Sequence, residues 1–150
     1  MAQIKKRRKV LTDYLYENEL VYKLINRILQ SGKKNLAYKI VHLSMLQLQE
    51  ITKQDPVTIL EKAIQNVSPT VEVKAKRLGG AVYQVPVKVS RQRAQTLGLR
   101  WILNEARGKS RKSIVLNLTN SILEASKGSG QAIRRKEELH RVAESNRMNI

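Results

Sequence analysis

The chain has no cysteine and no phenylalanine, one tryptophan, five tyrosines, and only 12 acidic residues against 29 lysines and arginines among its 150 residues. Without cysteine, disulfides, thiol catalysis and cysteine-containing zinc sites are excluded, and the composition fits a reducing compartment. No apolar run approaches the roughly 20 residues of a membrane span. No apolar signal-peptide stretch follows the basic residues 1–10. Scarce aromatic residues argue against base stacking as the main mode of nucleic-acid recognition and favour recognition of phosphates and shape.

Positive charge is what the sequence has in excess, with a formal net charge of +17. Self-repulsion at this charge destabilises the free compact state, and a polyanionic partner relieves it. Nucleic acid is the favoured partner, and an anionic membrane surface is the rival. Hydrophobic residues make up 41% of the 150, which is enough for one packed domain. We expect a basic arm at residues 1–12 and a single domain at residues 13–150.

Hydrophobic periodicity predicts a mainly α fold, a bundle of six helices with one projecting β-hairpin between the third and fourth helices. The helix at 36–52 has a broad apolar face that includes Leu36 and Leu43, and we expect it to be central. Gly98 inside a helix indicates close packing against another helix. The hairpin turns on Gly79 and Gly80. The expected helices span residues 18–30, 36–52, 56–68, 91–107, 114–127 and 131–145, and the hairpin spans 71–89.

The sequence offers no catalytic site. His42 and His140 stand alone within predicted helices, without partners at the spacing of a metal set or a triad. "GKS" at Gly108–Ser110 lacks the earlier glycine of a phosphate-binding loop, since Leu103 stands in that position. We therefore expect no enzymatic activity, no cofactor and no metal.

Basic residues recur in clusters at element ends and in loops, which suggests a surface that neutralises phosphates at several points. Arg91 and Arg93 stand in the first turn of a helix, where the helix dipole disfavours cations. We interpret this placement as serving an external anion. The clusters are Lys5, Lys6, Arg7, Arg8 and Lys9; Lys33 and Lys34; Lys74, Lys76 and Arg77; Arg91 and Arg93; Arg107, Lys109, Arg111 and Lys112; and Arg134, Arg135 and Lys136.

Helices combined with a hairpin also fit a winged-helix DNA-binding protein, in which a basic helix enters the major groove. That class gathers its charge on one compact face. Here the charge is spread over the arm, the hairpin, the loops and the last helix, which favours a partner that surrounds the protein, such as folded RNA. The DNA-binding interpretation stays open as the alternative.

Three segments carry a resemblance to a known family: "INRILQSGKKNLAYKIV" (Ile25–Val41), "VKAKRLGGAVYQVPVKV" (Val73–Val89) and "GSGQAIRRKEELHRVAESNR" (Gly128–Arg147). They resemble the bacterial and plastid small-subunit ribosomal protein S-seven family, in the same order along almost the whole chain. The resemblance implies six helices with a hairpin between the third and fourth. It also implies a structural protein that binds the 3′ major domain of small-subunit rRNA, nucleates assembly of the head and lines the exit-site path of mRNA and tRNA.

The resemblance further implies contact regions and partners. Neighbours would be the S-eleven and S-nine protein families, with mRNA and exit-site tRNA nearby, no membrane and no homo-oligomer. Gly79 and Gly80 would lie near the mRNA path. Frequent Ile, Lys and Asn indicate an AT-rich genome such as that of a plastid, so we favour a plastid stroma and keep a bacterial cytoplasm as the open alternative. The chain stops at "MNI" (Met148–Ile150), so contacts of the family's aromatic C-terminal extension are not carried over. The rRNA-binding regions that match by position are Lys5–Lys9, Lys33 and Lys34, Lys74–Arg77, Arg91 and Arg93, and Arg134–Lys136 with Arg141.

Overall fold

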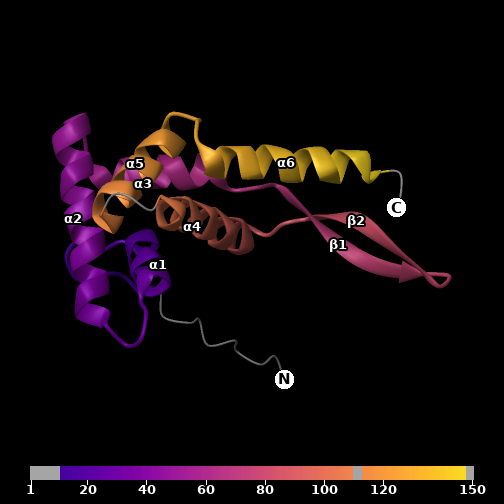
Figure 1. Ribbon diagram of the computed structural model, residues 1–150, viewed down its shortest axis with the longest axis horizontal. Helices are drawn as coiled ribbons and strands as arrows, with labels where there is room; N and C mark the ends of the chain where they lie inside the picture. The colour runs from indigo at the N-terminus through magenta and orange to yellow at the C-terminus, as the bar shows by residue number, and fades with distance from the viewer. Residues whose placement is uncertain (1–10, 110–112, 148–150) are drawn as a thin grey trace, which may run out of the picture.

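The computed structural model describes residues 11–109 and 113–147. It contains the six helices and the hairpin in the expected order (Figure 1). The predicted mainly α fold class, with the hairpin between the third and fourth helices, is confirmed. The elements are α1 (Glu19–Ile28), α2 (Lys34–Thr52), α3 (Pro56–Val67), β1 (Val71–Leu78), β2 (Ala81–Lys88), α4 (Arg91–Gly108), α5 (Ile114–Ser126) and α6 (Gln131–Ser145).

Side-chain caps fix the beginnings of four helices. The Asn18 side chain accepts hydrogen bonds from the first turn of α1, and the Asp55 side chain accepts one at the start of α3, where Pro56 occupies the first helical position. Ser90 and Ser113 cap α4 and α5 in the same way. Each cap satisfies a backbone N–H that has no partner inside the helix.

Helix α5 lies at the centre of the body, packed against α2, α3 and α4. Leu118, Ile122 and Ala125 on this helix are fully buried. Each buried leucine or isoleucine contributes roughly 1.5–3 kcal/mol to the stability of the fold, because folding removes its apolar surface from water. A Cβ built on Gly98 of α4 would lie 3.3 Å from the Ser68 hydroxyl at the end of α3. The expectation that Gly98 marks a close helix contact is confirmed.

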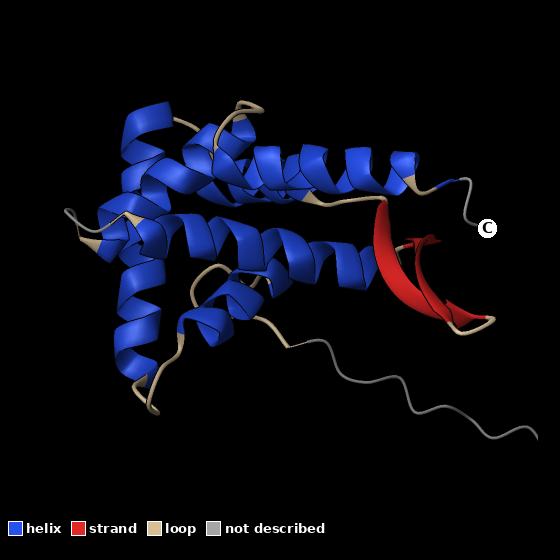
Figure 2. Ribbon diagram, turned by 45° about the vertical axis from the view of Figure 1, so that its right-hand side comes forward, coloured by secondary structure: helices blue, strands red, loops and turns tan. Residues whose placement is uncertain are grey.

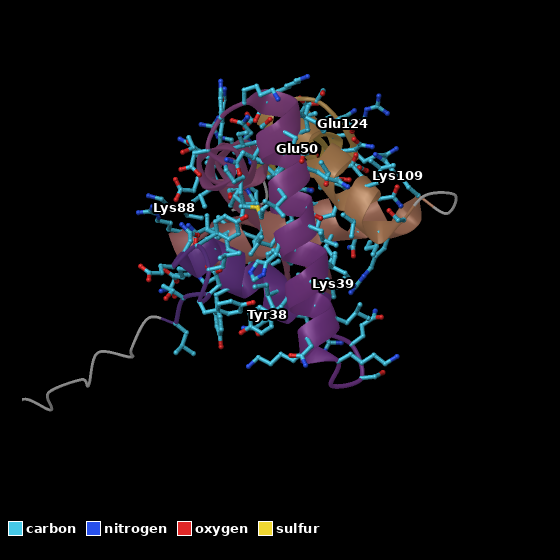
Figure 3. All side chains as sticks on the ribbon, turned by 90° about the vertical axis from the view of Figure 1, so that its left-hand side faces the viewer. Tyr38, Lys39, Glu50, Lys88, Lys109 and Glu124 are labelled. Atoms are coloured by element: carbon cyan, nitrogen blue, oxygen red, sulfur yellow. The ribbon has the colours of Figure 1, made fainter. Side chains whose placement is uncertain are left out.

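Helix α2 lies at one end of the body and not at its centre, so that expectation was wrong (Figure 1). It buries Ala37, Val41, Ser44, Met45 and Leu48. Leu36 is 50% exposed and Leu43 is 39% exposed on the outer side. Figure 3 looks onto this outer side, where Lys39 and Glu50 are labelled. The helix is apolar on several sides, and Val41, Met45 and Leu48 took the inward positions while Leu36 and Leu43 stayed outside.

The hairpin turns through Gly79 and Gly80, whose φ angles are +57° and +84°. Two positive φ angles in a two-residue loop are the requirement of a type I′ turn. Leu78 pairs with Ala81, and the antiparallel register continues to the pair of Val71 with Lys88. Since hydrogen-bonded and non-bonded pairs alternate from the turn, Pro86 falls in a non-bonded pair and its missing N–H faces outward.

The base of the hairpin is attached to the body, while its outer half is free. The Thr70 N–H donates to Nε2 of His140 on α6 at 3.1 Å. Arg93 Nε lies 3.3 Å from Glu72 Oε2, which joins α4 to β1. Residues 74–84 are all exposed. Figures 1 and 2 show the hairpin and α6 extending from the same side of the helical body. The hairpin is thus an arm that projects from the helical body and is attached to it through α4 and α6.

Candidate nucleic-acid interface

The structure places the predicted cations on five separate parts of the molecule. One pair stands at the turn into α2, three residues lie on β1, one pair begins α4, one lysine follows α4, and four residues lie on α6. Lys5, Lys6, Arg7, Arg8, Lys9, Arg111 and Lys112 lie outside the described residues. The described ones are Lys33, Lys34, Lys74, Lys76, Arg77, Arg91, Arg93, Lys109, Arg134, Arg135, Lys136 and Arg141.

The three basic residues of β1 do not share one face. Successive side chains of a strand point to opposite sides. Lys74 and Lys76 therefore lie on one face of the hairpin and Arg77 lies on the other. Tyr83 pairs directly with Lys76 and is 41% exposed. The arm thus presents positive charge to both of its sides.

Some of the predicted cations have internal partners. Arg93 pairs with Glu72 at 3.3 Å, and the Lys136 ammonium donates to the Asn66 carbonyl at 2.9 Å, which ties α6 to α3. Lys109 lies 3.9 Å from Glu105. The sequence-based interpretation of Arg93 as a residue placed for an external anion is therefore incomplete, because the Glu72 carboxylate accounts for its position.

The charged side chains of the remaining candidates make no hydrogen bond or ion pair with residues 11–109 and 113–147. Their charges are therefore available to external anions. Lys34 lies 5.8 Å above the Tyr38 ring, its one close aromatic contact in that part of the chain. These cations are Lys33, Lys34, Lys74, Lys76, Arg77, Arg91, Arg134, Arg135 and Arg141.

The two histidines have structural contacts. His140 accepts the Thr70 N–H, and burial, followed by the nearby Lys136 charge, lowers its pKa. His42 Nε2 lies 3.6 Å from the buried carboxylate of Asp13. No group of three or more His, Asp or Glu side chains in the described part of the chain could hold a metal ion. None of the described helices is long and apolar enough to cross a membrane.

Glu105 is a buried acid at the junction of α4, α5 and α6. Its Oε2 accepts the Ala132 N–H at 3.2 Å, at the first turn of α6. Burial raises the pKa of Glu105, and its hydrogen bond with Glu124 raises it further. A Cβ built on Gly130 would lie 2.9 Å from Glu124 Oε2, so glycine leaves the space that these carboxylates occupy. The cluster joins three helices, since Glu105 lies on α4, Glu124 on α5 and Ala132 on α6.

Sequence reasoning missed the loop formed by residues 13–18, which we call the Asp13 loop. Asp13 is 1% exposed, and its carboxylate accepts N–H bonds from Leu15 at 3.1 Å, Tyr16 at 2.8 Å and Asn18 at 3.0 Å. A carboxylate with three backbone donors organises a loop without regular structure. An aspartate shortly before a helix-capping asparagine was the available signal, since both residues favour local bonds to the backbone.

A helical body, a projecting hairpin and dispersed cations without internal partners are typical of structural proteins that bind folded nucleic acid through its phosphates. Comparison with known proteins identifies the family within this class. The family model for ribosomal protein S7p/S5e matches residues 1–147, and the chain belongs to that family. The family comprises structural ribosomal proteins, so the expectation of a protein without enzymatic activity is confirmed by the match.

The chain is also similar to curated relatives named "Small ribosomal subunit protein uS7c". It is 46% identical over 142 residues to the one from Tupiella akineta, covering 95% of this chain and 91% of the relative. The protein from Prototheca wickerhamii is 46% identical, again over 95% of this chain and 91% of the relative. The one from Nephroselmis olivacea is 41% identical over 94% of this chain and 90% of the relative. The predicted family resemblance is thereby confirmed.

Proposed function

We propose that this protein is a structural constituent of the small ribosomal subunit that binds the 3′ major domain of the rRNA, nucleates assembly of the head and lines the exit-site path of mRNA and tRNA. Membership of the ribosomal S7p/S5e family supports a structural ribosomal role. The names of the relatives support the small subunit, and their uS7c designation supports a plastid. Proteins of the S-eleven and S-nine families are the proposed neighbours.

The mechanism is neutralisation of phosphates by cations fixed on a rigid body. One observation supports this mechanism most directly. Among the described residues, the candidate cations at the α1–α2 turn and on β1, together with Arg134, Arg135 and Arg141 of α6, have side chains without an internal partner. Keeping such charges close together costs free energy in the isolated protein. Binding to RNA phosphates removes that cost and releases counterions. Because the helices fix the spacing of the cations, the protein would also fix the geometry of the rRNA junction that it binds.

The DNA-binding alternative is set aside because the chain belongs to a ribosomal family. The charge distribution agrees with that choice. Lys33 precedes α2 and Lys34 begins it, at one end of the molecule. The hairpin, which carries Lys74, Lys76 and Arg77, projects from the other side (Figure 1). A straight duplex would reach one of these regions at a time, whereas folded RNA can reach both.

A binding competition tests the proposal. The affinity of the full chain for an rRNA 3′-domain fragment is compared with its affinity for a DNA duplex of equal length, over a series of salt concentrations. We expect a clear preference for the rRNA fragment at physiological salt. Equal affinities would overturn the proposal, because phosphate charge alone would then account for binding.

Charge variants locate the interface. Replacing Lys74, Lys76 and Arg77 by Gln should weaken rRNA binding and lower the slope of log affinity against log salt by roughly 0.7–0.9 for each phosphate that the variant no longer neutralises. Removing residues 1–9 should have the same kind of effect. The matched control replaces three exposed lysines outside the candidate set by Gln, namely Lys53, Lys62 and Lys127. Equal effects of the hairpin and control variants would contradict a localised interface.

A further inference from the structure

Tyr14 occupies the outer side of the Asp13 loop. The loop is held from within by the three N–H bonds to the Asp13 carboxylate. It is closed by a bond from the Glu17 N–H to the Asp13 carbonyl at 3.1 Å. Because the backbone on both sides of Tyr14 is fixed in this way, this side chain has a defined position although it points to solvent.

Tyr14 is 71% exposed, more than any other large hydrophobic side chain in the described part of the chain. Its ring centroid lies 5.3 Å from that of Tyr38, with an angle of 54° between the rings. It also lies 5.3 Å from the His42 ring, in an edge-on arrangement at 85°. Both neighbours belong to α2, on whose lower part Figure 3 labels Tyr38. The ring is supported on one side and is not covered by a parallel stack.

Positive charge lies close to this ring. The Lys34 ammonium is 5.8 Å from the Tyr38 ring centroid, one aromatic ring away from Tyr14. Lys33 precedes it at the same turn and is exposed. The Asp13 carboxylate is buried under its N–H donors, which leaves Glu17 as the exposed acid of the loop. An aromatic face beside mobile cations is the combination that binds a single-stranded nucleotide, with the base on the ring and the phosphate on the lysines.

We propose that Tyr14 is a stacking site for one unpaired base of the rRNA, and that Lys33 and Lys34 hold the adjoining phosphate. The inference rests on the proposed function, which supplies the RNA. Composition alone disfavoured stacking as the main mode of recognition, but one rigid platform among many phosphate contacts needs only one tyrosine. Leu11 and Leu15 are 53% and 55% exposed, so an apolar protein segment is the competing occupant that the experiment must exclude.

The experiment measures binding of the full chain to the rRNA 3′-domain fragment at fixed salt. Tyr14→Ala should weaken binding about 5- to 150-fold, the range found for loss of one stacked base. Tyr14→Phe and Tyr14→Trp should bind within about twofold of wild type, because both keep the aromatic face. Tyr14→Leu keeps apolar area without an aromatic face and should behave like Tyr14→Ala. Leu15→Ala, at the next exposed position, is the matched control and should bind normally.

Salt dependence separates the two parts of the site. Tyr14→Ala should leave the slope of log affinity against log salt unchanged, whereas Lys33→Gln with Lys34→Gln should lower it by roughly 0.7–1.8, corresponding to one or two phosphates. Full binding by Tyr14→Ala, or binding by Tyr14→Leu equal to that of Tyr14→Phe, would overturn the stacking proposal while leaving the proposed function intact. Failure of the wild-type chain to prefer the rRNA fragment would overturn both.

Discussion

Asp13 should be one of the most sensitive positions for stability, although it lies before the first helix. Its carboxylate is 1% exposed and accepts three backbone N–H bonds, from Leu15, Tyr16 and Asn18. Hydrogen bonds to a charged group contribute about 1.5–3 kcal/mol each when partners are buried. The sum overstates the loss, because water can replace the bond at exposed Leu15 and removal of the carboxylate also removes its own cost of burial. We expect Asp13→Ala to lower the free energy of unfolding by about 2–4 kcal/mol.

Urea unfolding followed by circular dichroism measures this loss, against a total stability of about 5–15 kcal/mol for a domain of this kind. Asp13→Asn keeps one acceptor oxygen and should lose roughly half as much. Glu19→Gln is the control, since Glu19 is an exposed acid paired with Lys23 at 2.8 Å and such pairs contribute about 0.3–0.5 kcal/mol. A loss under about 1 kcal/mol for Asp13→Ala, or one no larger than that of Glu19→Gln, would refute the reasoning.

Three further predictions concern a buried acid, a histidine and the hairpin turn. Because the pKa of Glu105 is raised, the free energy of unfolding of the protein falls as pH rises through that pKa. Glu105→Gln should therefore be more stable than wild type at neutral pH, with the difference vanishing on acidification in thermal unfolding; a difference that grows towards acid would contradict it. Because the pKa of His140 is lowered, the folded protein loses stability as pH falls below the ordinary pKa of histidine. The protection factor of the Thr70 amide in hydrogen exchange should then drop between about pH 7.5 and about pH 5, and a constant value would show that the bond to His140 contributes nothing. Replacing Gly79 and Gly80 by valines should disorder the hairpin tip, because both φ angles are positive, while circular dichroism shows the same helical unfolding as an Asn-Gly control; loss of cooperative unfolding would mean that the tip supports the core.

Local chemistry made most of the fold predictable. Asp55 and Ser90 fix helix beginnings through bonds that involve only neighbouring residues, and Gly79 with Gly80 fixes the turn and hence the register. The position of α2 depends instead on which of its apolar residues fit against α5. Periodicity could not decide this, because the helix is apolar on several sides and Leu43 competes with Met45 for the interior.

The candidate interface was predictable to a similar degree. Clustering identified the regions of positive charge, because lysine and arginine at element ends are exposed in almost any packing. It could not show that Arg93 meets Glu72, which lies 21 residues earlier and is brought near only by the hairpin. The surroundings of the exposed Tyr14 ring could not be predicted either, since they come from the Asp13 loop and from α2.

The central place of α5 has a consequence for the order in which the chain can fold during synthesis. The Asn66 amide donates to the Ala125 carbonyl, 59 residues later, and the Ser44 hydroxyl donates to the Val115 carbonyl, 71 residues later. At about 5–20 residues per second, roughly 3–12 s separate the appearance of the partners of the shorter link. During that interval α2 and α3 have no central helix to pack against. The apolar sides of α2 and α3 that face α5 therefore lack their partner until most of the sequence has been made.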